Sequence, residues 1–260
     1  MNPAFLAVAG MMLAATSPSW AAPPAAKAKT ATSAAKAKKA TPSAKSKKKK
    51  ASIAKPADAA AAQKVAVPVL MSTQATRVAQ WVGSAKDNHA LPYIIIDKQG
   101  AHAFLFDAAG KPLADAPVLI GIAPGDDATP GIGAKSLSEI GPAEKTTPAG
   151  RFLAKFGVAA GKQRVLWVDY ATSVALHTIP PGNPKEKRTQ RMLSPVIDDN
   201  RITFGCINVP KLFYNQKVSP LFRKKGGYVY ILPDSKPIEE VFPRLRVQPF
   251  LNATTNAAEG

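Results

Sequence analysis

Tyr-Ile-Ile-Ile-Asp-Lys-Gln-Gly-Ala-His-Ala-Phe-Leu-Phe-Asp, residues 93–107, gives the clearest indication of fold class in this chain. The first five residues are rich in β-branched and apolar side chains, which favours a buried strand. In the second half apolar residues alternate, so that Phe104 and Phe106 share one face. The turn sequence Asp-Ala-Ala-Gly follows at residues 107–110. The stretch therefore predicts two strands and a turn.

Short strand patterns continue on the C-terminal side of this stretch. Further strands are expected at residues 116–122, 151–158, 165–170, 174–179 and 228–232. One helix is expected over residues 73–86, with Ser72 as its N-cap, and a second from Pro210 to about residue 225, broken near Ser219-Pro220. Long loops are expected at 124–146 and 180–200. Many short strands with few helices predict a mainly β protein with a largely antiparallel sheet or sandwich.

The N-terminal residues have the features of an export signal. Residues 3–21 carry no charged side chain, residues 4–15 are apolar, and small residues stand at Ser19 and Ala21. This pattern predicts a cleaved signal peptide over residues 1–21 and secretion across the inner membrane to the periplasm or cell wall. The apolar run is shorter than the roughly 20 residues of a membrane span, so no transmembrane anchor is expected.

Residues 22–64 are a basic segment of low complexity. They contain 12 lysines and one acid, Asp58, and so hold most of the net charge of +18. Too few apolar residues are present to form a core, which predicts disorder. The segment is either an electrostatic tether to anionic cell-envelope polymers or a solvated spacer. No aromatic residue is interleaved with the lysines, so specific nucleic-acid binding is not expected.

The chain has one cysteine, Cys206, and three histidines. No disulfide can form within the chain, so the thiol is either a buried structural residue or a reactive one. A free thiol has a pKa of about 8.5 and needs a base for catalysis. His177, near the end of a predicted strand, can face an active site, whereas His89 is expected in a loop and His102 in solvent. Sequence spacing alone does not distinguish a catalytic pair from a core histidine.

The residues around this pair resemble the signature of L,D-transpeptidases of the YkuD family. That family has a His, a loop, Ser/Thr-His-Gly-Cys, an apolar residue, and Asn or Arg. This chain has His177-Thr178, a loop, and Thr-Phe-Gly-Cys-Ile-Asn at residues 203–208. Upstream, Thr-Thr-Pro-Ala-Gly-Arg-Phe at 146–152 is similar to the family's Thr-Pro-x-Gly-x-Phe. Further similar blocks lie at 94–97, 104–111 and 118–121, so the resemblance covers about residues 92–232.

The resemblance implies an L,D-transpeptidase-like β-sandwich with a few short helices. The catalytic domain is expected over residues 92–233, after a helix and linker at 65–91 and before a C-terminal extension at 234–260. Peptidoglycan peptide stems are the implied partners. No cofactor is implied, and one Cys with three scattered His gives no plausible metal site.

The resemblance also implies a two-step acyl transfer. The Cys206 thiolate would attack the carbonyl of the third residue of a tetrapeptide stem, release the terminal D-Ala, and pass the acyl group to an amine in a 3→3 cross-link. His177 would take the thiol proton and return it to the leaving amine. Supporting or oxyanion-binding roles fall to Thr178, Phe204 and Gly205, and substrate binding to Asn208 and Arg201.

Two features depart from the family pattern. Phe204 stands where the family commonly has His, so an imidazole at that position is not essential here. The loop between His177 and Thr203 is longer than usual and contains Lys185, Lys187, Arg188 and Arg191. This loop either covers the cleft and binds acidic stems or is a solvated charged loop.

Two other functions remain open from the sequence. On the same fold, water can take the acyl group, which would make the protein an L,D-carboxypeptidase or a hydrolase. A non-catalytic cell-wall-binding protein is the third possibility, favoured by Phe204 and the lysine-rich segment. The presence of both Cys206 and His177 argues against it.

Overall fold

The structure is a computed structural model that describes residues 70–159 and 162–247. The predicted signal peptide and lysine-rich segment lie outside these residues. The strands are β1 (Tyr93–Asp97), β2 (His102–Phe106), β3 (Pro112–Pro117), β4 (Ile120–Gly121), β5 (Gly150–Val158), β6 (Arg164–Asp169), β7 (Val174–Thr178), β8 (Arg201–Thr203), β9 (Ile207–Val209) and β10 (Gly227–Ile231).

The helical elements are short, apart from the first. The α-helices are α1 (Thr73–Ala85), α2 (Arg188–Met192), α3 (Lys211–Phe213), α4 (Ser219–Phe222) and α5 (Ile238–Val241), and η7 (Tyr214–Val218) is a π-helical turn between α3 and α4. The 3₁₀ turns are η1 (Ile132–Ala134), η2 (Leu137–Glu139), η3 (Pro142–Glu144), η5 (Pro184–Glu186), η6 (Ile197–Asn200) and η8 (Pro243–Val247). The Ser72 hydroxyl accepts a hydrogen bond from the Ala75 N–H and caps α1, as predicted.

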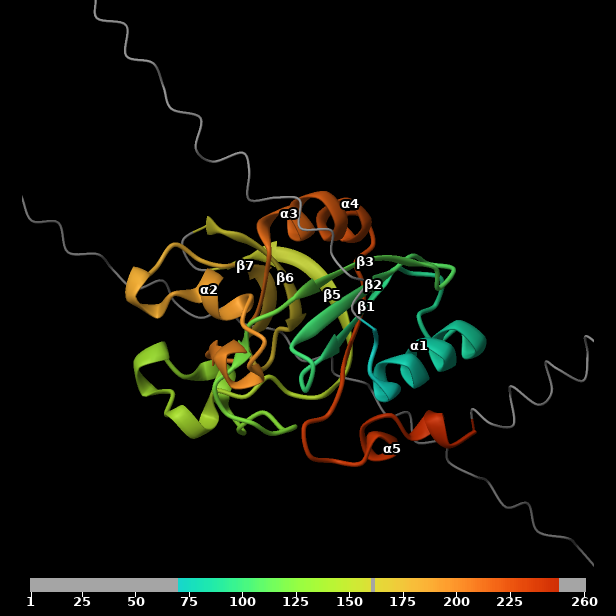
Figure 1. The fold of residues 1–260 in the computed structure, drawn as a ribbon, viewed down its shortest axis with the longest axis horizontal. Helices are drawn as coiled ribbons and strands as arrows, with labels where there is room; N and C mark the ends of the chain where they lie inside the picture. Colours follow the sequence, from blue (N-terminus) through green and yellow to red (C-terminus); the bar gives the residue numbers. More distant parts are fainter. Residues whose placement is uncertain (1–69, 160–161, 248–260) are drawn as a thin grey trace, which may run out of the picture. The chain divides into compact units, whose positions relative to one another are not determined.

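Within the described residues, eight strands form one sheet in the order β3-β2-β1-β10-β5-β6-β7-β9 (Figure 1). Strand β10 lies in the middle of this sheet, parallel to β1 and antiparallel to β5. At the far end β9 is parallel to β7. Strands β4 and β8 pair separately in a small parallel sheet. The segments before and after the loop at 180–200 therefore meet at the β7–β9 end of the sheet.

The two halves of the large sheet share one apolar core. Ile96 of β1 and Leu105 of β2 belong to the same buried cluster as Leu166 of β6 and Leu176 of β7. The segment α3–η7–α4 closes this cluster with Phe222. Burial of each such side chain stabilises the fold by about 1.5–3 kcal/mol. The arrangement confirms the mainly β, sandwich-like fold predicted from the sequence.

Strands β1, β2 and β10 are buried on both faces. Helix α1 and the segment α5–η8 cover the outer face, and Figure 1 shows α1 and α5 on the same side of the sheet. Trp81 of α1 meets Tyr230 of β10 edge to face at 5.9 Å between ring centroids, and Phe242 lies 6.2 Å from the same ring. The described parts of 65–91 and 234–260 thus pack onto the same core as 92–233. The boundaries between these three segments remain predictions.

Three details differ from the sequence-based expectation. The strand expected at 116–122 is divided, because β3 ends at Pro117, which has no N–H to donate, and the chain then turns to pair with β8. Strand β9 was not predicted, since three residues are too few to show a periodic pattern. The helix from Pro210 continues through Pro220, which cannot donate a backbone hydrogen bond. The π-helical turn η7 directly before α4 changes the hydrogen-bond pattern so that the helix accommodates this proline.

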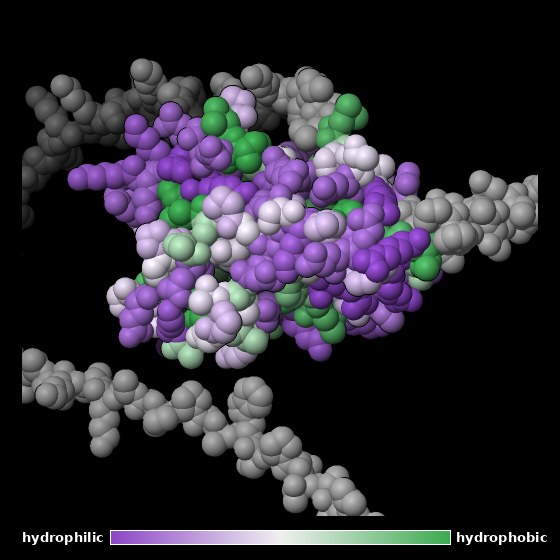
Figure 2. All heavy atoms as spheres, turned by 90° about the horizontal axis from the view of Figure 1, so that it is seen from below, coloured by the Kyte–Doolittle hydropathy of each residue, from purple (hydrophilic) through white to green (hydrophobic). Residues whose placement is uncertain are grey.

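The face of the molecule in Figure 2 is mostly hydrophilic, with small separate apolar areas. This agrees with apolar side chains being gathered in the two buried clusters. In the described ranges, every helix is too short or too polar to cross a membrane.

Candidate active site around Cys206 and His177

Cys206 lies in the turn between β8 and β9, and its backbone is held by contacts on both sides. Gly205 has φ +121°, where glycine is favoured, and a Cβ at this position would lie 2.7 Å from the Thr146 carbonyl oxygen. The Thr203 hydroxyl accepts from the Gly205 N–H at 3.2 Å and donates to the Cys206 carbonyl at 2.6 Å. Because a side chain at residue 205 would clash with the Thr146 carbonyl, only glycine fits at this position. The turn therefore holds the backbone of the neighbouring Cys206 in place.

The thiol of Cys206 is half-buried and neutral in the resting site. Its Sγ donates to the Ser173 carbonyl at 3.6 Å, a long contact from the turn between β6 and β7. Burial raises the pKa of the Cys206 thiol, while a backbone hydrogen bond with Ala175 and the positive charge of Arg188 act in the opposite direction. Because burial dominates, the thiol needs a proton acceptor before it can act as a nucleophile.

His177 lies opposite Asn208 in the parallel pairing of β7 and β9. Cys206 stands directly before β9, and its Sγ contacts the Ser173 carbonyl directly before β7. The nucleophile therefore lies at the start of β9 and the imidazole on the neighbouring strand β7, at one end of the sheet. In the part of the chain that the structure describes, no hydrogen bond joins the Cys206 thiol to the His177 ring, as is common before substrate binds.

The tautomer of His177 follows from its neighbour Thr178. The ring Nδ1 lies 2.7 Å from the Thr178 carbonyl oxygen, which can only accept, so Nδ1 carries the proton and Nε2 has the lone pair. Burial lowers the pKa of His177; the hydrogen bond to Thr178 raises it, and the charge of Arg188 lowers it. The imidazole is consequently neutral at neutral pH, with Nε2 ready to take a proton.

A second contact to the imidazole comes from Asn208, which is 1% exposed. Its Nδ2 lies 3.5 Å from His177 Nε2, and its Oδ1 accepts from the Arg188 guanidinium at 2.9 Å. Arg188 also donates from Nε to Glu186 at 2.6 Å. Arg188 therefore fixes which end of the Asn208 amide faces the imidazole, and it brings a positive charge close to both reacting groups.

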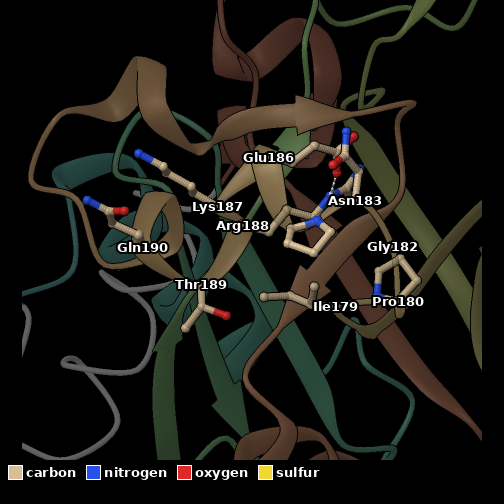
Figure 3. A pocket seen from close by; sticks show the side chains of 10 residues that line it. Ile179, Pro180, Gly182, Asn183, Glu186, Lys187, Arg188, Thr189 and Gln190 are labelled. Atoms are coloured by element: carbon tan, nitrogen blue, oxygen red, sulfur yellow. Dashed lines mark hydrogen bonds and ion pairs between the residues drawn. The ribbon is translucent and has the colours of Figure 1, made fainter.

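The long loop between β7 and β8 supplies Arg188 and contains a hollow of about 370 Å³ (Figure 3). Its wall includes Ile179, Asn183 and Glu186, whereas Cys206 and His177 do not line it. The hollow is thus beside the reacting pair and not around it.

The four cations of this loop are placed differently. Lys185 and Lys187 are exposed, and the Arg191 Nε donates to the Asp199 carbonyl at 2.6 Å. Arg191 also donates to the Arg201 carbonyl at 3.1 Å, whereas Arg188 is the member of this set that bonds to Asn208 beside the imidazole. At Arg188 the loop therefore contacts the site and is not simply solvated. Binding of acidic stems by the loop remains a prediction.

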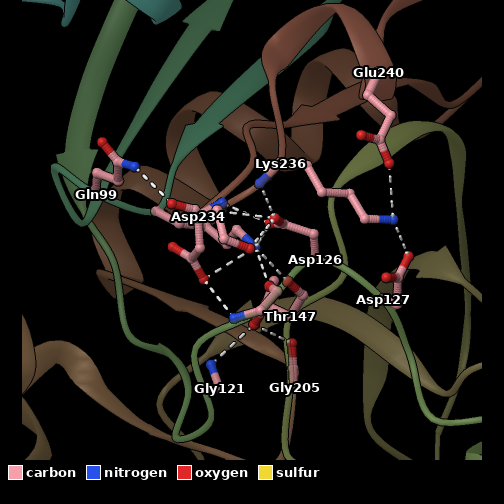
Figure 4. Close-up of polar contacts among 12 residues, drawn as sticks. Gln99, Gly121, Asp126, Asp127, Thr147, Gly205, Asp234, Lys236 and Glu240 are labelled. Carbon is pink, nitrogen blue, oxygen red and sulfur yellow. Dashed lines mark hydrogen bonds and ion pairs between the residues drawn. The ribbon is translucent and has the colours of Figure 1, made fainter.

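Behind the nucleophile turn lies a group of four charged side chains, Lys98, Asp126, Asp234 and Arg201, here called the buried ion cluster. Figure 4 labels its two carboxylates, Asp126 and Asp234. The fully buried Lys98 ammonium lies 2.9 Å from Asp126 and 3.2 Å from Asp234, and Arg201 lies 2.7 Å from Asp234. Burial alone would raise the pKa of Asp126, but backbone N–H groups of residues 234–236 and the Lys98 ammonium hold it well below its usual range. The Asp126 carboxylate therefore stays ionised beside the Lys98 ammonium.

Thr147 connects the buried ion cluster to the nucleophile turn. Its carbonyl accepts from the Lys98 ammonium at 3.0 Å. Its hydroxyl donates to the Gly205 carbonyl at 2.8 Å and accepts from the Gly121 N–H at 2.9 Å, as Figure 4 shows. The position of Cys206 thus depends on a chain of contacts that begins at a buried lysine.

The structure brings Cys206, His177 and Asn208 together and sets the Thr178 carbonyl behind the imidazole. The remaining residues of the sequence-based set are Phe204, Gly205 and Arg201. Phe204 is 37% exposed, with the Lys145 ammonium 3.8 Å from its ring centroid. The Gly205 N–H already bonds to Thr203, and Arg201 is paired with Asp234. Oxyanion binding by the turn and substrate contact by Asn208 and Arg201 remain predictions.

Sequence reasoning was wrong about His102 and missed the buried ion cluster. His102 was expected in solvent, but it is buried and its Nε2 lies 2.8 Å from Asp115 on β3. Lys98 directly after a buried strand, and Asp126 after Gly125 in a long loop, were weak signals of the cluster. Neither pattern indicates which distant residues will meet. Within residues 70–159 and 162–247, no group of three or more His, Cys, Asp or Glu side chains is arranged to hold a metal ion.

No protein-family profile matches the chain, and neither does any curated protein sequence. Among solved structures, the chain is similar to an L,D-transpeptidase from Xylanimonas cellulosilytica, with 14% identity and a TM-score of 0.33 over 54% of this chain and 60% of that one. An Enterococcus faecium L,D-transpeptidase variant has 18% identity and a TM-score of 0.28 over 54% of this chain and 49% of that one. An L,D-transpeptidase from Mycobacterium smegmatis has 14% identity and a TM-score of 0.30 over 54% of this chain and 58% of that one. The chain thus spans less than two thirds of each of these structures. The chemistry of this chain rests on its own residues.

Proposed function

We propose that this protein is a cysteine-dependent L,D-transpeptidase acting on the peptide stems of peptidoglycan. The observation that carries the proposal is that β7, which bears His177, pairs with β9, and Cys206 stands in the turn directly before β9. The imidazole holds its Nδ1 proton on the Thr178 carbonyl and presents the Nε2 lone pair, which a thiol nucleophile requires of its base. The resemblance of residues 203–208 to the L,D-transpeptidase signature supplies the substrate class.

In the first step, Cys206 Sγ attacks the carbonyl carbon of the third residue of a tetrapeptide stem while His177 Nε2 takes the thiol proton. Both groups are neutral beforehand, so proton transfer accompanies attack. The backbone N–H groups of Phe204 and Cys206 are the proposed oxyanion donors, because neither has a hydrogen-bond acceptor within the described part of the chain. The imidazolium then protonates the nitrogen of the terminal D-Ala, which leaves, and a thioester remains on Cys206.

In the second step, the side-chain amine of another stem attacks the thioester carbonyl. The amine loses a proton to His177 Nε2, the C–S bond breaks, and the Cys206 thiol is restored with that proton. The product is a 3→3 cross-link, and no cofactor enters the balance. With water in place of the amine, the same acyl-enzyme would give a carboxypeptidase or hydrolase.

This activity belongs outside the inner membrane, in the periplasm or cell wall, where the proposed signal peptide at 1–21 would deliver the protein. The basic segment at 22–64 would then meet anionic envelope polymers. Both segments lie outside the described residues, so their roles are part of the proposal.

The test uses purified disaccharide tetrapeptide and mass spectrometry of the products. A cross-linked dimer that has lost one D-Ala supports transpeptidation, while a tripeptide product assigns the hydrolytic alternative. A Cys206→Ala variant is the control and should give neither product. If the intact protein also gives neither product but still binds isolated cell wall, the non-catalytic alternative replaces the proposal.

A further inference from the structure

Lys145 lies against the nucleophile turn with an ammonium that has no acidic partner. Its carbonyl accepts from the Ala123 N–H at 3.1 Å, and the next carbonyl, that of Thr146, is the one packed against Gly205. The side chain reaches over Phe204, with Nζ 3.8 Å from the ring centroid. Among the described residues, no hydrogen bond or ion pair engages Nζ. The backbone of Lys145 is therefore fixed while its charge is free.

Other charged groups near the site already have partners. Arg188 is bonded to Asn208 and Glu186, and Arg201 is paired with Asp234. The carboxylate next in sequence to Lys145, Glu144, is taken by Lys135 at 2.5 Å and by the Gly141 N–H at 2.9 Å. Lys145 is therefore the positively charged side chain beside the nucleophile turn that remains free to bind an anion at Cys206.

The pairing with Phe204 gives this charge an apolar neighbour. Phe204 is partly exposed, and an ammonium over an aromatic face retains N–H donors that point away from the ring. A ligand that suits both groups has a small anion beside a small apolar group. An alanine residue with a free carboxylate has this form.

We infer that Lys145 and Phe204 form the subsite for the terminal carboxylate of the residue that leaves the donor stem. The inference rests on the proposed function and adds a specificity determinant to it. The leaving carboxylate is one residue, about 3.6 Å, beyond the attacked carbonyl. Phe204 is two residues from Cys206, a span of at most about 7 Å. The distance from the attacked carbonyl to the terminal carboxylate and methyl group of the stem is therefore within the span from Cys206 to Phe204 and its Lys145 partner.

The subsite predicts a preference for donors with a free carboxylate. Wild-type protein should turn over the tetrapeptide acid about 10- to 100-fold more efficiently in kcat/KM than the same peptide with a C-terminal amide, because a charge-assisted hydrogen bond is lost in the amide. Lys145→Met should lower kcat/KM for the acid to the level of the amide. Lys145→Arg keeps a cation over the ring and should retain most of the preference.

Lys111→Met is the matched control, because Lys111 is an exposed lysine in the turn between β2 and β3. It should keep the full preference for the acid. If Lys145→Met prefers the acid as strongly as the wild type does, the subsite assignment is wrong while the proposed function stands.

A second measurement does not depend on peptide turnover. Cys206 is the one cysteine of the chain, so alkylation by iodoacetate and by iodoacetamide reports on this site alone. The ratio of the two rates should be several-fold lower in Lys145→Met than in the wild type and unchanged in Lys111→Met. A lower ratio without any stem turnover would keep the carboxylate subsite and overturn the proposed function; an unchanged ratio would count against the subsite.

Discussion

The two sides of the nucleophile turn treat polar groups in opposite ways. In the buried ion cluster, the Lys98 ammonium has four oxygen partners between 2.6 and 3.2 Å. On the reactive side, the Cys206 thiol contacts the backbone of Ser173, at 3.6 Å, and of Ala175. His177 Nε2 lies 3.5 Å from Asn208, and Lys145 Nζ has no acceptor among the described residues. The comparison teaches that the buried side holds the nucleophile turn in place. On the reactive side, the thiol, the imidazole and the Lys145 ammonium remain able to bond with substrate.

The two sides are joined through Thr147, whose carbonyl belongs to the buried side and whose hydroxyl bonds to Gly205. Changes on the buried side should therefore appear mainly in stability, and changes on the reactive side mainly in turnover. Mutations that separate these two readouts test the comparison directly.

The largest effect is expected for His177→Ala. Loss of the general base should lower turnover about 10²- to 10⁴-fold and slow alkylation of Cys206 at neutral pH. Because burial raises the pKa of Cys206, alkylation of this variant should recover only above pH of about 8.5. In the wild type, burial lowers the pKa of His177, so turnover should persist below pH of about 6.5 and fall as the imidazole becomes protonated.

The control for His177→Ala is His89→Asn, at an exposed position with φ 48° that Asn tolerates. This variant should keep wild-type turnover. A folded His177→Ala protein with full activity, or with wild-type alkylation rates at every pH, would exclude His177 as the base.

Asp126→Ala should have the next largest effect, on stability. The substitution leaves Lys98 buried with one carboxylate fewer and removes the acceptor of the N–H groups of residues 234–236. The free energy of unfolding measured in urea should therefore fall by about 3–5 kcal/mol. The folded-state pKa of Asp126 is depressed; its stabilising contribution is therefore present above pH of about 3.9 and lost as pH falls toward the lower folded value.

Asp127→Ala is the matched control for this change. Asp127 is 74% exposed at its side chain and pairs with Lys236 at the surface, so its loss should cost less than about 1 kcal/mol. Equal losses in the two variants would show that the buried ion cluster has no special role.

The smallest effect is expected for Arg188→Gln. The positive charge of Arg188 lowers the pKa of both His177 and Cys206, so its removal should move the acid limb of turnover and the alkylation profile to higher pH. Turnover near neutral pH should fall by about tenfold or slightly more, since a hydrogen bond from a charged donor such as the Arg188 guanidinium is worth about 1.5–3 kcal/mol. Lys187→Gln removes the same charge from an exposed neighbour, and a similar shift in that variant would exclude a local effect of Arg188.

The sequence by itself determined the local elements and the candidate chemistry. Strand β1 has the predicted bounds, α1 begins after its predicted cap at Ser72, and the mainly β class follows from many short apolar stretches. These features depend on neighbouring residues, whose preferences can be read along the chain. Cys206 and His177 were found in the same way, because a lone thiol and an imidazole stand in local patterns.

Only the tertiary structure decided how distant segments meet. The parallel pairing of β7 with the three-residue β9 sets Asn208 opposite His177, and strand context of this kind outweighs local propensity. Lys98 is buried because Asp126 and Asp234, 108 residues apart, converge on it. Burial of a charge depends on partners from any part of the chain. For that reason the pKa shifts, the free charge of Lys145 and the support behind Cys206 are properties of the folded molecule.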